Sequence, residues 1–174
     1  MKNFKMLSGI IFFLFIATKS FSQGMMPPPP IDSPVMSSME GTWVSEPYQF
    51  MGSTMTDECT QKMVLNGQFM EVNVKSTTPG GFTYEAIVLI APSSDGTLTG
   101  TSFDVFGEKA ITSYTGTWKG NMLYLDGRSS WGIESRVINI DGDVMLHNVI
   151  YKMKDEKGNP LPDQSVAITY NKKN

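Results

Sequence analysis

From residue 40 onward the chain consists of short runs of alternating apolar and polar residues, separated by turns rich in glycine, asparagine and aspartate. The turns recur about every 8 to 12 residues, which is typical of all-β barrels and sandwiches. No stretch carries a sustained helical period. The runs between the turns predict about ten strands, at 41–51, 55–65, 68–76, 82–91, 97–106, 110–118, 121–126, 131–140, 143–153 and 164–171.

The connections between these runs are short and contain the residues that tight turns require. Asn66-Gly67 lies between two β-rich runs and predicts a two-residue hairpin, because both positions of that turn need positive φ. Short connections favour pairing between sequential neighbours. We therefore predict an up-and-down antiparallel meander rather than a Greek key.

Alternation assigns one face of several strands to the interior. The inward residues of 68–76 and 110–118 are predicted to be Met70, Val72, Val74, Tyr114, Gly116 and Trp118. Two stretches, 86–91 and much of 144–153, are apolar on both faces. Such strands are expected where another segment or subunit covers the outer face.

A sheet of about ten strands curls or closes because its twist accumulates, and closure removes the exposed edges. We therefore predict a single up-and-down antiparallel β-barrel over residues 39–174. A barrel of this size has room for one small ligand. Trp43, at the start of the first strand, is predicted to close one end of the barrel.

The first 22 residues have the features of a secretory signal peptide. Lys2 and Lys5 precede an apolar run, and Ser20-Phe21-Ser22 supplies a small-x-small cleavage site. The run is shorter than the roughly 20 residues that span a bilayer, and the alternative is an uncleaved anchor. No cysteine follows it to accept a lipid. We therefore expect a periplasmic or secreted protein without a membrane span after cleavage.

Residues 23–38 are rich in proline and methionine, and this composition predicts an extended linker that is mobile or lies along the surface. Methionine thioethers can bind Cu(I) in exported proteins. Here they bring no charge and are irregularly spaced, so we predict a linker and no metal site.

Composition limits the other classes of function. The chain has 174 residues, a net charge of −3 and 18% charged residues, which suits one soluble domain. It has no basic tract for nucleic acid. Cys59 is the single cysteine, so an intramolecular disulfide is excluded. Its thiol is predicted to be buried, the alternative being a reactive or intermolecular thiol.

Few residues could act in catalysis. A typical zinc site or a histidine-based triad needs several histidines or cysteines, and this chain has one of each, with no other ligand at a suitable spacing nearby. His147 lies mid-strand among apolar residues and is interpreted as a structural residue, with a ligand contact or a haem axial ligand as alternatives. Arg136 is interpreted as a surface cation near Glu134, with an interior anchor for a ligand carboxylate as the alternative. We expect no cofactor.

Aromatic residues are expected chiefly in the core, and any that line a cavity would bind an apolar or planar molecule. Trp118 is the preferred candidate for a ligand contact. The full set of candidate ligand-binding residues is Trp118, Tyr114, Tyr84, Phe103, Arg136 and His147.

Several segments together resemble the bacterial family known as domain of unknown function 1579, over nearly all of 39–173. The resemblance implies a calycin-type barrel, similar to lipocalins and fatty-acid-binding proteins, without an established activity. The ending Phe21-Ser22-Gln23 of the signal segment resembles those of Bacteroidetes, which implies a Gram-negative source. The residues that carry the family resemblance are Glu40-Gly41-Thr42-Trp43, Val64-Leu65-Asn66-Gly67-Gln68-Phe69, Phe82-Thr83-Tyr84-Glu85-Ala86, Ser94-Asp95-Gly96, Tyr114-Thr115-Gly116-Thr117-Trp118 and Val166-Ala167-Ile168-Thr169-Tyr170-Asn171-Lys172-Lys173.

Three functions are compatible with these observations. The leading hypothesis is a barrel that binds a small apolar or amphipathic molecule. A non-catalytic envelope or assembly module is the second, in which the strands that are apolar on both faces pair two copies of the chain. The third is an isomerase or hydrolase in which His147 works with a carboxylate, and we favour it least.

Overall fold

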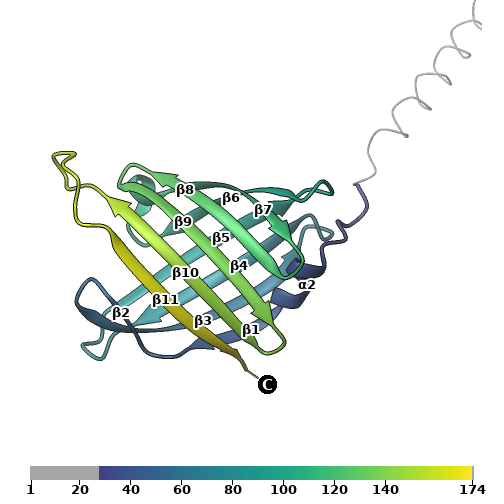
Figure 1. Cartoon of the computed structure of the whole chain (residues 1–174), viewed down its shortest axis with the longest axis horizontal. Helices are drawn as coiled ribbons and strands as arrows, with labels where there is room; N and C mark the ends of the chain where they lie inside the picture. The colour runs from purple at the N-terminus through teal and green to yellow at the C-terminus, as the bar shows by residue number, and fades with distance from the viewer. Residues whose placement is uncertain (1–27, 174) are drawn as a thin grey trace, which may run out of the picture.

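The computed structural model describes residues 28–173, and these form a closed antiparallel β-barrel (Figure 1). The predicted signal peptide lies outside the described residues. The strands are β1 (Gly41–Ser45), β2 (Tyr48–Phe50), β3 (Ser53–Val64), β4 (Phe69–Thr77), β5 (Thr83–Pro92), β6 (Thr97–Asp104), β7 (Thr112–Lys119), β8 (Met122–Ser129), β9 (Gly132–Asp141), β10 (Val144–Met153) and β11 (Gln164–Lys172). Two short helices accompany them, α2 (Pro34–Met39) and the 3₁₀ helix η1 (Gly107–Ala110).

Each strand from β3 to β11 pairs with its neighbours in sequence, and β1 closes the ring by pairing with both β11 and β3. The result is a ten-stranded barrel with β2 added alongside β3. The predicted up-and-down barrel is confirmed. The first predicted strand, 41–51, is divided into β1 and β2, because residues 46–47 are not in strand conformation and the register with β3 shifts there by one residue.

The turn between β3 and β4 is longer than the predicted two residues. Leu65, Asn66 and Gly67 all adopt positive φ, at 50°, 58° and 69°. Part of the linker packs on this turn, since the Gln68 amide donates to the Pro29 carbonyl at 2.7 Å. Residues 28–30 are exposed there. This part of the linker therefore lies along the surface, as predicted.

The end of the linker, residues 34–38, differs from the prediction, because it belongs to α2 and is helical rather than extended. Val35, Met36 and Met39 are each at most 2% exposed, and α2 lies at one end of the barrel (Figure 1). Trp43 is completely buried beside it and donates its indole N–H to the Met39 carbonyl at 2.7 Å. The six residues of α2 are too few to show a helical period in the sequence. The helix can nevertheless begin at Pro34, because proline is well tolerated in the first turn of a helix. We call this end, made by α2 and Trp43, the floor.

The interior changes in character from the floor to the opposite end, which we call the rim. Turns at 65–68, 120–121 and 142–143 share the floor end, because sequential antiparallel strands alternate in direction. The buried residues nearest the floor are apolar, namely Met70, Ile90, Leu98, Leu123, Ile140 and Met145. Towards the rim the inward positions become polar, and they include Asp57, Ser76, Tyr84, Asp104, Glu134, Arg136 and Tyr151.

Two parts of the outer surface are apolar, on the strands for which a covering segment was predicted. Ile87 is 47% exposed on β5, and Leu146 and Ile150 are 43% and 46% exposed on β10. Within residues 28–173 no segment covers these side chains. No helix of the described part is both long and apolar enough to cross a membrane.

Candidate functional site

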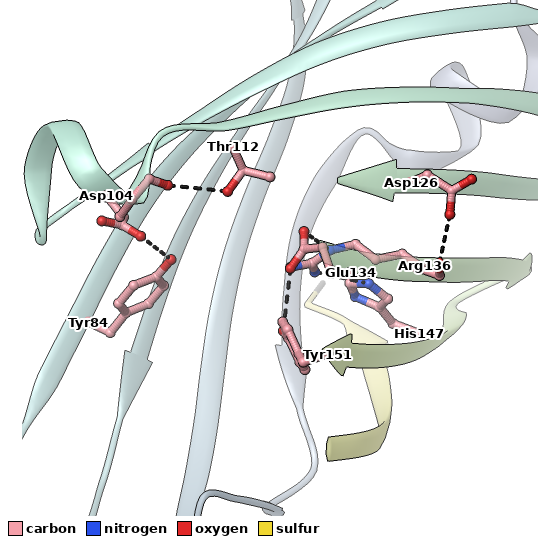
Figure 2. A network of polar contacts seen from close by, with 10 residues as sticks. Tyr84, Asp104, Thr112, Asp126, Glu134, Arg136, His147 and Tyr151 are labelled. Atoms are coloured by element: carbon pink, nitrogen blue, oxygen red, sulfur yellow. Dashed lines mark hydrogen bonds and ion pairs between the residues drawn. The ribbon is translucent and has the colours of Figure 1, made fainter. Parts of the chain in front are cut away.

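An ion pair between Glu134 and Arg136 lies on the inward face of β9, within the network of polar contacts in Figure 2. Arg136 donates from Nε to Glu134 Oε1 at 2.8 Å and from Nη2 to Glu134 Oε2 at 2.9 Å. The two residues are two apart on β9, so both project to the same face of the sheet. Their side chains are only 21% and 11% exposed. The pair is therefore a bidentate, largely desolvated interaction.

A glycine on the neighbouring strand makes room for this pair. Gly127 of β8 lies opposite Glu134 on one side and opposite Tyr114 of β7 on the other. A Cβ atom at Gly127 would lie 2.7 Å from both Glu134 Cγ and Tyr114 Cε1. Glu134 and Tyr114 thus occupy the space that any other residue at 127 would need.

Two residues of β10 complete the surroundings of the guanidinium. Arg136 Nη1 lies 3.3 Å from His147 Nε2, and Nη2 donates to the Tyr151 hydroxyl at 3.4 Å. The guanidinium carbon also lies 5.7 Å from the centroid of the Tyr151 ring and 5.9 Å from that of Tyr114. Arg136 is therefore held by hydrogen bonds in its plane and by aromatic rings above it.

The residues around Arg136 each have one defined protonation state at neutral pH. Burial alone would raise the pKa of Glu134, but the charge and hydrogen bonds of Arg136 bring it below its ordinary value. Burial, and then the charge of Arg136, lower the pKa of His147 well below its ordinary value. His147 is therefore neutral and can accept the Arg136 N–H. Burial raises the pKa of Tyr114 to about 12, against the opposing charge of Arg136.

A second carboxylate is buried on β3. Asp57 is 4% exposed and accepts the Tyr48 hydroxyl at 2.9 Å and the Tyr170 hydroxyl at 2.7 Å, while its own N–H donates to Ser45 Oγ at 2.8 Å. Cys59, next inward on the same strand, is 4% exposed. Burial, and then the charge of Asp57, raise the pKa of its thiol to about 12. This thiol is therefore protonated and buried, in agreement with the prediction.

A third carboxylate lies at the rim. Tyr84 donates to Asp104 Oδ2 at 3.1 Å (Figure 2), and Asp104 Oδ1 accepts the Phe106 N–H at 2.8 Å. The Phe106 ring lies 6.1 Å from that of Tyr84 and 6.0 Å from that of Trp131. Phe106 and Trp131 are 56% and 46% exposed, so this row of rings lies beside the mouth of the barrel.

Several inward-facing side chains in the middle of the barrel are not completely covered. Val72, Val74 and Val88 face inward by register, yet none of them is fully buried. Arg136, which faces the same interior, is 21% exposed. Side chains in a close-packed interior have little exposed surface, whereas these side chains retain part of theirs.

The residues singled out from the sequence lie in the interior, in the floor and on the outer face of the barrel. Tyr84, Tyr114, Trp118, Arg136 and His147 all face the interior, and the prediction of an inward face for Tyr114 and Trp118 is correct. Trp43 lies in the floor.

Two interpretations are corrected. Arg136 is not a surface cation, because it shares an inward face with the buried Ile138 and Ile140. Phe103 points outward and is 46% exposed, because the inward positions of β6 are those of Leu98 and Ser102. Phe103 therefore cannot contact a molecule inside the barrel.

Several polar residues of the interior were not anticipated, namely Tyr48, Asp57, Asp104, Tyr151 and Tyr170. They lie on five different strands, and a single sequence does not reveal such pairings. One pattern in the sequence could have indicated the inward position of Glu134 and Arg136. By alternation they lie on the same face of β9 as the apolar Ile138 and Ile140.

The geometry does not favour acid–base chemistry at His147. Its Nε2 faces the Arg136 guanidinium rather than a carboxylate, and its pKa lies well below the ordinary value. The same contact occupies the nitrogen that an iron atom would need. Among residues 28–173 no group of three or more His, Cys, Asp or Glu side chains is placed to hold a metal ion.

The fold and the interior define the chain as a closed, ten-stranded antiparallel β-barrel with a partly polar interior. The crystal structure of Rv2717c from M. tuberculosis is similar, with a TM-score of 0.61 and 13% sequence identity, covering 82% of this chain and 99% of that one. At that identity the likeness shows the fold alone. No protein-family model and no curated protein matches the sequence.

Proposed function

We propose that this protein is a binding barrel for a small amphipathic molecule. The observation that carries the proposal is the partial exposure of inward-facing residues in the middle of a closed barrel, above all Arg136 at 21%. Interior space lined on one side by apolar and on the other by polar groups is what ligand sites commonly provide. The scarcity of catalytic groups supports binding rather than catalysis.

The interior is apolar near the floor and polar near the rim, and this difference suggests how the ligand would be oriented. Its apolar part would contact Val72, Val74 and Val88 and point towards the apolar floor. Its polar group would face the rim half, where Tyr84, Asp104 and the Glu134–Arg136 pair are found. The open rim, beside Phe106 and Trp131, is the route by which a ligand would enter.

We further propose that the protein acts outside the cytoplasm, in the periplasm or after secretion. The support is the basic, apolar and small-residue sequence of the first 22 residues. We also infer that the chain is a diverged member of the family of domain of unknown function 1579. The segments between Glu40 and Lys173 that resemble this family support the inference.

Filling the interior should abolish most of the binding. We choose Val88→Phe, because Val88 faces inward and is partly exposed, and phenylalanine would take up the space that a ligand needs. Fluorescence titration with the neutral probe N-phenyl-1-naphthylamine measures the affinity. The wild-type protein should bind about one probe per chain, and the variant should bind it much more weakly.

The adjacent residue provides the matched control. Ile87 lies on the same strand, points outward and is 47% exposed, so Ile87→Phe adds an aromatic ring without entering the interior. This variant should bind the probe as the wild type does. Equal loss in both variants, or no saturable binding by the wild type, would contradict the proposal.

The apolar outer face of β9 and β10 favours one additional role, the pairing of two copies of the chain. Ile133, Leu146 and Ile150 are 43–46% exposed there. Contiguous exposed apolar residues often mark a contact surface. Light scattering should then report a dimer, and a monomer at high protein concentration would eliminate this role without affecting the binding proposal.

A further inference from the structure

The hydrogens of the interior polar groups are largely used within the protein. A phenol has one hydrogen to donate. Tyr48 and Tyr170 both give theirs to Asp57, and Tyr84 gives its own to Asp104. Towards a ligand, these three tyrosines can therefore offer only oxygen lone pairs.

Arg136 is similarly occupied. Its Nε and Nη2 donate to Glu134, and Nη1 faces the acceptor nitrogen of neutral His147. A ligand carboxylate would have to displace Glu134 from a bidentate pair that is already desolvated. With the Tyr151 hydroxyl as a further acceptor, four of the five N–H groups of Arg136 have partners in the protein, so the guanidinium offers at most one N–H to an anion.

The formal charge of this region is negative. Three carboxylates, those of Asp57, Asp104 and Glu134, face inward in the rim half against one guanidinium, so the sum is three negative and one positive charge, or −2. The ammonium of Lys172 lies elsewhere, 5.2 Å from the centroid of the Trp43 ring beside the floor. An anion entering the rim half would be repelled, and a cation attracted.

Three buried polar atoms lack a partner within the described residues: Ser33 Oγ, next to α2, and two atoms that face the barrel interior. Gln61 is 3% exposed, faces inward, and its Oε1 accepts no hydrogen bond there. This is one more acceptor that a ligand or water hydrogen could satisfy. The other atom is Trp118 Nε1, a single neutral donor opposite Leu123 in the apolar half. One indole N–H among apolar residues does not stabilise a carboxylate.

We propose that the ligand's polar group is a hydrogen-bond donor, a primary ammonium or an alcohol, and that the barrel discriminates against carboxylates. This inference rests on the proposed binding function. The donor would meet oxygen lone pairs of Asp104 and Tyr84. The Tyr151 hydroxyl, which accepts from Arg136, keeps its own hydrogen for an oxygen atom of an alcohol.

Three ligands with the same tail test the polar group. Decylamine, decan-1-ol and sodium decanoate are used to displace N-phenyl-1-naphthylamine from the wild-type protein at pH 7, each below its micellar concentration. At this pH the amine is protonated and the acid ionised. Decylamine should bind about tenfold more tightly than decanoate, or better, with decanol between them. Added salt should weaken decylamine binding and leave decanol unchanged.

A pair of isosteric variants locates the preference. Asp104→Asn removes one interior charge and keeps an oxygen for Tyr84, so it should reduce the preference for decylamine over decanoate several-fold. Asp126→Asn makes the same change on the outer face, where Asp126 accepts from Ser135, and should leave the preference unchanged. Circular dichroism confirms that both variants are folded, and the salt response of the wild type tests the charge argument independently of them.

The outcomes separate the two proposals. Decanoate binding as tightly as decylamine, or more tightly, would overturn this inference while leaving the binding function in place. If neither the naphthyl probe nor any of the three ligands binds, the binding function itself falls, and this inference falls with it.

Discussion

Replacing Arg136 by methionine should lower the free energy of unfolding by about 3–5 kcal/mol at pH 8, because it leaves the Glu134 carboxylate buried without its partner. Methionine keeps much of the apolar volume of the arginine stem, so packing changes little. Urea denaturation measures the loss. The double variant Glu134→Gln, Arg136→Met should recover much of it, since no unpaired charge remains.

The stability loss caused by Arg136→Met should also depend on pH. In the wild type the pKa of Glu134 lies below its ordinary 4.5, so this residue contributes stability above that pH and loses it as the pH falls through the lowered value. Without Arg136, burial instead raises the pKa of Glu134. The difference in stability between wild type and Arg136→Met should therefore be large at pH 8 and shrink towards pH 4.

An exposed ion pair provides the control for Arg136. Lys152 lies 3.9 Å from Asp163, and both side chains are about 60% exposed (58% and 61%). Lys152→Met should leave the unfolding midpoint nearly unchanged, as is usual for surface pairs. If Arg136→Met were equally harmless at every pH, the interior ion pair would not be the desolvated interaction described above.

Replacing Trp43 by alanine should cost about 3–5 kcal/mol, the usual range for truncating a buried tryptophan. Trp43 is completely buried in the floor, and its loss would also leave the Met39 carbonyl without the indole N–H. Thermal and urea unfolding report the change. Trp43→Phe should fall between wild type and Trp43→Ala, because it restores part of the volume without the donor.

Trp131 is the natural comparison for Trp43. It is 46% exposed at the rim, where its main aromatic contact is the Phe106 ring at 6.0 Å. Trp131→Ala should therefore have little effect on stability. A similar loss for both tryptophans would mean that the floor does not hold the barrel together in the way that its burial indicates.

The barrel could be predicted from sequence because its signals are local. Turn residues separate the strands, and short connections leave few ways to pair them. The predicted strand boundaries agree with β3 to β11 to within two residues, except at the end of β8, which extends three residues further, to Ser129. The inward face of β4 also follows directly from the alternation of Met70, Val72 and Val74 with polar residues.

The floor and the polar wall were harder to predict, because the burial of their residues depends on contacts with segments that are distant in the sequence. The helix α2 is too short to have a recognisable period, and only its place at the barrel end explains why Val35 and Met36 are buried. In β9 the apolar Ile133 faces outward and Arg136 inward, against the usual rule. The partners that compensate for this, His147 and Tyr151, come from another strand.

The most direct test of the account is to observe the interior while a ligand is added. In ¹H–¹⁵N spectra, the neutral probe N-phenyl-1-naphthylamine should shift the Nε–H signal of Arg136 and the indole signal of Trp118 in a saturable manner, and leave the indole signal of Trp43 in place. This result is expected if the ligand enters the barrel between the valines and the polar wall. Shifts confined to the exposed Trp131, or no saturable shift at all, would contradict the claim that the barrel binds a small molecule inside.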